Sequence, residues 1–150
     1  MSNTEDVKKL RSETGGGVME CRQALLDARG DYEKAKEILA SSALAIAKKK
    51  ADRATKNGLI EGYVHGGKIG VLVEVLCESD FVSKNAMFKD MAHKIAMQIA
   101  SMDPENTEEL LAQEYFADPK MTVADFLNNQ IMQIKENIVI KRFVRYELGE

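Results

Sequence analysis

Two cysteines and two histidines are the side chains of this 150-residue chain best suited to covalent chemistry: Cys21, Cys77, His65 and His93. A cysteine nucleophile needs a thiolate beside a histidine, which would pair Cys77 with His65 or His93. His65 falls at the turn of a predicted hairpin, and Cys77 falls at the far end of the second strand of that hairpin. Since a strand rises about 3.3 Å per residue, they are too far apart for a hydrogen bond, and His93 falls on the polar side of a predicted helix. The sequence therefore argues against a cysteine enzyme.

Metal and nucleotide sites are also disfavoured by the spacing. Structural zinc sites use ligands in close pairs, and no two of the four Cys and His residues are spaced that way. The run Gly15-Gly16-Gly17 could suggest a phosphate loop, but the lysine of a Walker motif does not follow it. No serine nucleophile elbow or dinucleotide fingerprint occurs. We therefore expect no covalent chemistry, no cofactor and no bound metal.

The segment of residues 77–85 is more informative, because a strand pattern ends there and a helix pattern begins. It places a carboxylate, Asp80, next to a large apolar ring, Phe81, in a predicted connection. Connections normally carry residues compatible with solvent. An aromatic ring there either packs into its own core, as most aromatics do, or contacts another molecule. The pattern alone leaves both possibilities open.

The composition is that of an ordinary soluble globular protein, with 45% hydrophobic and 30% charged residues. The polar start has no signal-peptide pattern, and no apolar run approaches the roughly 18 residues of a membrane span. The net charge of −3 argues against a dedicated nucleic-acid binder. We therefore expect a cytoplasmic protein with no membrane contact, no direct nucleic-acid contact, and two reduced, buried thiols.

Residues 1–42 are predicted to form an N-terminal module of three helices. Val7, Leu10 and Thr14 share one helix face before the glycine run, a second apolar stripe runs from Val18 to Gly30, and Asp31 caps the third helix. Val18 and Met19 follow the glycines directly, and either both are partly exposed at the tip of the bundle or one of them belongs to its core.

Residues 43–57 are rich in alanine and lysine and predict a helical linker. The run Lys48-Lys49-Lys50 in this linker is either a solvated helix face or a surface that contacts RNA.

Residues 58–150 predict an α+β core with a three-stranded antiparallel sheet packed with helices. The strands fall at residues 59–64, 69–77 and 138–148. Ser79 or Asp80 can cap a short turn through Lys84, and Asn85 can cap a helix that ends before Asp103. Further helices are expected over residues 107–115 and from Thr122. The second strand is apolar on both faces, so we expect one face under helices and the other under a second sheet or a second subunit.

Five stretches of the chain carry a recognisable series of motifs: residues 10–25, 49–53, 58–59, 79–85 and 136–149. These stretches resemble the elongation factor Ts family, and they occur in the family's order. The resemblance implies a guanine-nucleotide exchange factor for elongation factor Tu that performs no covalent chemistry itself and promotes GDP release by disturbing the magnesium and phosphate site of that partner. It also implies that the N-terminal module is a ubiquitin-associated-type bundle.

The resemblance also implies which residues contact the partner. Asp80, Phe81, Val82 and Ser83 match the family segment that enters the G domain of elongation factor Tu near its magnesium ion. The N-terminal module would dock on the G domain through its own motif, and His65 resembles a position that makes a second contact. The motif residues of the N-terminal module are Arg11, Val18, Met19 and Cys21.

The chain departs from the family pattern between Pro104 and Pro119, which is shorter than the helical insertion of many relatives. It also lacks a duplicated second subdomain. The resemblance to relatives with a single copy implies a homodimer in which the sheets of the two chains pair. Val144 excludes a disulfide through the last strand. An alternative function is a non-catalytic adaptor of the translation machinery, which would bind protein through Val18 and Met19 or RNA through the lysine run.

Overall fold

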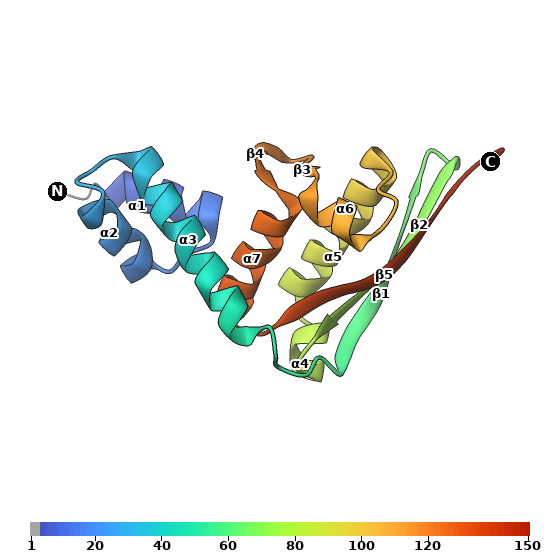
Figure 1. The fold of residues 1–150 in the computed structure, drawn as a ribbon, viewed down its shortest axis with the longest axis horizontal. Coiled ribbons are helices and arrows are strands. Elements are labelled where there is room, and N and C mark those ends of the chain that lie inside the picture. Colours follow the sequence, from blue (N-terminus) through green and yellow to red (C-terminus); the bar gives the residue numbers. More distant parts are fainter. Residues whose placement is uncertain (1–3) are drawn as a thin grey trace. The chain divides into compact units, whose positions relative to one another are not determined.

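The computed structural model describes residues 4–150 and contains two compact units (Figure 1). The first unit is the chain as far as Asp52 together with Leu127–Lys135, and the second is Arg53–Phe126 with Glu136–Glu150. The fold is mixed helix and sheet, and its three-stranded sheet is antiparallel, as the sequence predicts.

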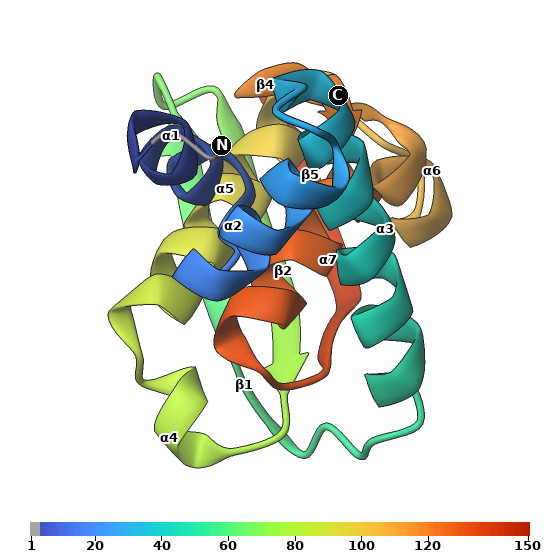
Figure 2. The ribbon, with the colours of Figure 1, turned by 90° about the vertical axis from the view of Figure 1, so that its left-hand side faces the viewer.

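The first unit begins with three helices, α1 (Thr4–Thr14), α2 (Val18–Asp27) and α3 (Tyr32–Lys50), with α1 and α2 lying beside the N-terminal half of α3 (Figure 2). Asp31 caps α3, as predicted, by accepting a hydrogen bond from Lys34 N at 3.2 Å. The core between the helices is small and apolar, and it contains the predicted helix stripes. Its most buried members are Leu10, Cys21, Ala24, Leu25, Ala35 and Leu39.

The third predicted helix continues without a break into the first part of the predicted helical linker. The module was expected over residues 1–42 and the linker over residues 43–57; α3 runs unbroken to Lys50, and β1 (Asn57–His65) begins seven residues later. No glycine or proline interrupts this stretch, and Ala43 is buried on the same helix face as Ala35 and Leu39. The apolar stripe therefore continues past the predicted boundary.

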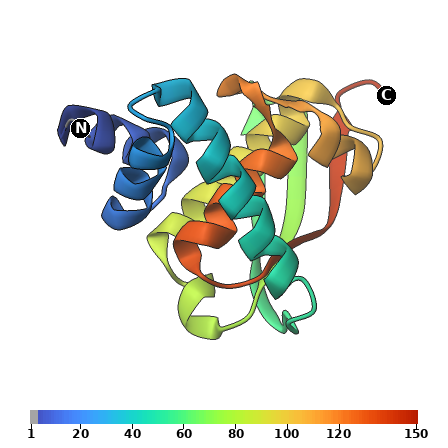
Figure 3. The same cartoon turned by 60° about the vertical axis from the view of Figure 1, so that its left-hand side comes forward.

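The first unit also contains the C-terminal part of α7 (Val123–Ile134), drawn in orange in Figure 3. At its end, the ammonium of Lys50 donates to the carbonyl of Lys135 at 3.1 Å. The sequence pattern identified α7 as a helix but gave no sign of this contact across 85 residues, because helical periodicity carries no information about distant partners.

The second unit is built on a sheet of strand order β1-β2-β5, with β2 at Ile69–Cys77 and β5 at Ile138–Glu147. Its helices lie on one face of this sheet (Figure 1). The long helix α5 (Ala86–Met102) contacts both β1 and β2 and covers that face. The buried side chains between them are Val71, Val73, Val75 and Cys77 from β2 and Phe88, Met91, Ile95 and Ile99 from α5.

The opposite face of the sheet is exposed and apolar within a single chain. The sequence predicts either a second sheet or a second subunit over this face, and within the single chain no second sheet formed by residues 4–150 covers its large side chains. The register places them together: Leu72 of β2 pairs with Val144 of β5 and with Gly62 of β1. We name this set the open face, and its exposed apolar members are Ile60, Val64, Leu72, Val144 and Tyr146.

The predicted helix over residues 107–115 is too long. Helix α6 (Thr107–Ala112) ends earlier, and β3 (Glu114–Tyr115) and β4 (Asp118–Thr122) form a small hairpin that we missed. Gln98, fully buried on α5, donates to Glu114 O at 3.0 Å and accepts from Phe116 N at 2.8 Å. A buried amide that needs backbone partners therefore overrides the local helical pattern.

Candidate functional site

The segment that follows β2 turns through two capped helices. Ser79 caps α4 (Asp80–Ser83) by accepting a hydrogen bond from Val82 N at 3.2 Å, and Asn85 caps α5 by accepting from Met87 N at 2.7 Å. Both caps agree with the sequence prediction. In Figure 2, α4 lies beyond the end of β2, before the chain turns into α5.

Phe81 projects from the first turn of α4 and is 82% exposed. Its neighbours Val82 and Ser83 are buried, so they attach the turn to the unit. Ser83 Oγ also donates to Asp80 O at 2.7 Å and to Asp80 Oδ1 at 3.2 Å. Of the two possibilities that the sequence left open for Phe81, packing into its own core is therefore excluded.

Asp80 and Lys84 form an ion pair across the same turn, with Oδ2 and Nζ 2.9 Å apart. The hydrogen bond and charge of Lys84 lower the pKa of Asp80, and Asp80 in turn raises the pKa of Lys84. Both side chains are exposed, so the pair adds little stability, but it keeps a carboxylate ionised beside the ring.

Glu136 also belongs to this site, although its role was missed by the sequence analysis. Its carboxylate accepts hydrogen bonds from the backbone of Glu78 and Ser79, at the start of the turn. The two segments are 57 and 58 residues apart, and only the pairing of β2 with β5 brings them together. No local sequence signal could have revealed the contact.

A second group of candidate residues lies on the N-terminal module. Val18 and Met19, in the first turn of α2, are 46% and 72% exposed, so neither belongs to the core and both lie at the tip. Arg11 is exposed near the end of α1. Cys21 is fully buried in the helical core, where burial raises the pKa of its thiol. Its side chain therefore supports the turn that carries Met19, and it is not part of the surface that a partner could contact.

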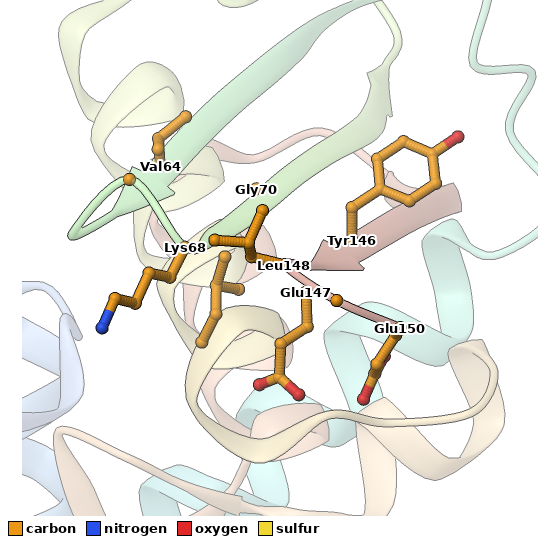
Figure 4. A pocket seen from close by; sticks show the side chains of 10 residues that line it. Val64, Lys68, Gly70, Tyr146, Glu147, Leu148 and Glu150 are labelled. Carbon is orange, nitrogen blue, oxygen red and sulfur yellow. The ribbon is translucent and has the colours of Figure 1, made fainter.

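His65 lies at the exposed turn end of β1, where its Nδ1 is 2.9 Å from Tyr63 Oη. Figure 4 shows a shallow cavity of about 440 Å³ beside the same turn, with Lys68 on one side and Glu147 and Glu150 on the other. His65 does not line this cavity.

The structure separates the cysteine and histidine that a cysteine enzyme would need. In the register of the hairpin His65 pairs with Ile69, whereas Cys77 pairs with Asn57 at the other end. Cys77 is buried, and burial raises the pKa of its thiol to about 11. Since the thiolate is the reactive form, Cys77 has the character of an inert core residue.

Within residues 4–150, no three His, Cys, Asp or Glu side chains gather closely enough to hold a metal ion. Over the same range, no helix is both long and apolar enough to cross a membrane.

The fold and the site define a class of protein that presents exposed apolar side chains on short, capped turns, as surfaces that contact other macromolecules do. Comparison with known sequences gives the family. The chain belongs to the elongation factor Ts family: it is 41% identical to elongation factor Ts of Thermoanaerobacter sp. (strain X514), over 100% of this chain and 96% of that protein. A sequence model of the family, elongation factor TS, matches residues 78–150.

Other relatives agree. The chain is 40% identical to elongation factor Ts of Caldanaerobacter subterraneus subsp. tengcongensis, over 100% of this chain and 98% of that protein. It is 41% identical to elongation factor Ts of Carboxydothermus hydrogenoformans, over 100% and 90% respectively. These alignments span 196 positions, against 150 residues here, so the relatives contain residues that this chain lacks.

Proposed function

We propose that this chain is a guanine-nucleotide exchange factor that binds elongation factor Tu and accelerates the release of GDP. The observation that carries the proposal is the exposed Phe81 ring on an anchored, capped turn in a member of the elongation factor Ts family. This role places the protein in the cytoplasm. It needs no covalent chemistry from the chain, because an exchange factor acts only by binding.

In the proposed mechanism, the turn from Asp80 to Ser83 enters the G domain of the partner near its magnesium ion. Mg²⁺ requires nearly ideal octahedral coordination by oxygen, so a ring inserted beside its ligands disturbs the bridge between ion, protein and phosphate. Phe81 is the inserted group, and Val82 and Ser83 hold the turn that carries it.

The energetics require the factor to prefer the nucleotide-free partner, because equal affinity for both states would shift nothing. Coupling between two binding sites is reciprocal. A factor that weakens nucleotide binding is therefore released more readily when nucleotide rebinds, which closes the cycle.

The N-terminal module would provide a second contact with the G domain. We infer a ubiquitin-associated-type bundle that docks through Arg11, Val18 and Met19, with the buried Cys21 supporting the docking turn. His65, exposed at the hairpin turn, would make a further contact with the partner.

Replacing Met19 by alanine is expected to weaken binding of elongation factor Tu by about tenfold, because a largely exposed apolar side chain becomes buried at the interface. Titration calorimetry with nucleotide-free elongation factor Tu measures this loss. Leu26→Ala is the matched control, since Leu26 is an exposed apolar residue of the same helix outside the motif. Equal affinities for Met19→Ala and wild type would contradict docking through α2.

We also infer that the open face pairs with the same face of a second chain. Apolar groups on a sheet face are stabilised when another layer covers them, and here one side of the sheet has cover from its own helices while Ile60, Leu72 and Tyr146 have none. A homodimer joined by two such sheets would bury this surface.

The dimer predicts a mass in solution of twice the 16.7 kDa of one chain, measured by light scattering at micromolar concentration. Leu72→Lys is expected to shift the mass to that of one chain, because it would bury a charge in the interface. Leu26→Lys, outside the sheet, should leave the dimer intact. A wild-type protein with the mass of one chain at every micromolar concentration measured would contradict the homodimer.

A second candidate is an adaptor that binds translation components without accelerating exchange, and the exposed Val18 and Met19 are compatible with it. One assay separates the two functions. The chain is added to elongation factor Tu loaded with a fluorescent GDP analogue, and release is followed after a chase with unlabelled GDP. An exchange factor accelerates release in proportion to its concentration, whereas an adaptor binds and leaves the rate unchanged.

A further inference from the structure

Glu136, in the connection from α7 to β5, holds the start of the Phe81 turn through one carboxylate. Its Oε1 accepts hydrogen bonds from Glu78 N and Ser79 N, both at 3.0 Å, and its Oε2 accepts from Ser79 Oγ at 2.6 Å. Hydrogen bonds to an ionised acceptor are among the stronger ones in proteins. Three of them converge two residues before the exposed ring.

The contact continues into the helix that carries the ring. Ser79 Oγ donates to Glu136 and at the same time accepts from Val82 N at 3.2 Å, as the N-cap of α4. Helix α4 has only four residues, far fewer than an independently stable helix requires. The direction of the ring therefore depends on what holds the cap, and the cap is held by Glu136.

A reciprocal contact keeps Glu136 itself in place. Glu78 Oε2 accepts from Asn137 N at 2.5 Å, so each of the two glutamates accepts from the backbone of the other's segment. Asn57 Nδ2 donates to Glu78 O at 2.9 Å, and Asn137 Nδ2 donates to Arg53 O at 3.0 Å. Contacts from two other segments, residues 53–57 and 136–137, thus fix the end of β2.

We infer that Glu136 is a positioning residue for exchange: it fixes the cap of α4 and so the direction in which Phe81 enters the partner. This inference rests on the proposed function, since it assigns a cause to the activity of the ring. The ion pair of Asp80 with Lys84 lies within the turn and can stiffen it, but it cannot orient the turn relative to the sheet. Glu136 supplies that orientation.

The test uses the full chain and compares Glu136→Ala with Glu136→Gln in the GDP-release assay. Glu136→Ala removes all three acceptor contacts and is expected to lower the stimulated rate about tenfold, as the loss of a charge-assisted contact would. Glu136→Gln keeps one carbonyl oxygen for the two backbone N–H groups, and we expect it to stay within about threefold of wild type. Rescue by glutamine separates positioning from simple loss of bulk.

The same substitutions in a Phe81→Ala background separate positioning from general loss of stability. If Glu136 acts through the ring, Glu136→Ala should cost less than about twofold there, because the two effects are not additive. An equal loss in both backgrounds would overturn the inference, and so would full activity of Glu136→Ala. Should Glu136→Ala fail to fold, Ser79→Ala replaces it. This variant removes the hydroxyl that joins Glu136 Oε2 to Val82 N, keeps both backbone contacts with Glu136, and is expected to show the same dependence on Phe81.

A readout independent of activity keeps failure of this inference distinct from failure of the proposed function. Hydrogen–deuterium exchange over residues 78–85 should become at least several-fold faster in Glu136→Ala, with residues 18–27 unchanged as the internal control. Unchanged exchange would overturn the role of Glu136 even if the chain is an exchange factor. Faster exchange in a chain that does not accelerate GDP release would instead refute only the proposed function.

Discussion

Phe81→Ala is expected to lower the stimulation of GDP release from elongation factor Tu by about 30-fold or more. The ring is 82% exposed, so its apolar surface is available to be buried in a partner. Truncating a central aromatic contact in an interface typically costs about 2 kcal/mol or more, which corresponds to roughly that factor. The measurement is the rate of release of a fluorescent GDP analogue, with wild type and variant at equal concentrations.

The effect of Phe81→Ala on the rate depends on which state of the partner the ring contacts. If Phe81 contributed equally to the complexes with GDP-bound and nucleotide-free partner, its loss would weaken binding but leave the maximal rate unchanged. If the Phe81 ring contacts the partner only while the magnesium site is disturbed, it raises the maximal rate of GDP release itself. We therefore expect the rate at saturating factor to fall, and a concentration series separates the two cases.

The stability of the chain should be nearly unaffected, because an exposed side chain contributes little to folding. Thermal unfolding of Phe81→Ala and wild type checks this. Met102→Ala serves as the matched control: Met102 is an exposed apolar residue at the far end of α5 and should keep full activity. If Phe81→Ala accelerated GDP release as much as wild type does, the proposed insertion of the ring beside the magnesium site would be refuted.

Local pattern was sufficient to predict much of this fold. The stripes of α1 and α2 and the cap Asn85 are properties of neighbouring residues and were predicted correctly, and Ser79 is one of the two caps predicted for the turn. The error in the hairpin region has a long-range cause. Helix α6 was predicted too long because Gln98, on another helix, binds the backbone of the segment that follows it.

The site was less predictable than the fold. The direction of Phe81 depends on the rotation of a four-residue helix, and periodicity cannot fix the rotation of so short an element. Glu136 and the packing of Val82 decide which side chains of this short helix are buried and which are exposed. Both depend on residues that are distant in the sequence. The open face was predicted as apolar, but whether a second chain covers it is a property of an assembly rather than of one chain.

Gly58 shows how a residue of the matched sequence stretches can act through the backbone. It lies in β1 opposite Leu76, with φ at +156°, and a Cβ at this position would lie 2.1 Å from the carbonyl oxygen of Val75. A contact this short between a side chain and backbone cannot be relieved by rotating a side chain. The strand would have to move away from β2.

Gly58→Ala is therefore expected to lower the free energy of unfolding by about 3 kcal/mol, and the melting temperature by roughly 10 °C. Thermal unfolding followed by circular dichroism measures this. Gly62→Ala is the matched control in the same strand: its Cβ would lie 3.3 Å from Leu72 Cδ2, a side-chain atom that can shift, and we expect a change of less than about 1 kcal/mol. Equal melting temperatures for the two variants would contradict the backbone argument.

Gly58→Ala should also affect the Phe81 turn, because Gly58 is next to Asn57 in the chain. Asn57 Nδ2 donates to Glu78 O at 2.9 Å, and Glu78 N donates to Glu136. Displacing β1 stretches the first of these contacts and loosens the end of β2 that carries the α4 cap. Gly58→Ala should therefore lower stimulated GDP release even at temperatures where the protein remains folded, whereas Gly62→Ala should not. A folded Gly58→Ala protein with wild-type activity would show that β1 does not help to hold the Phe81 turn.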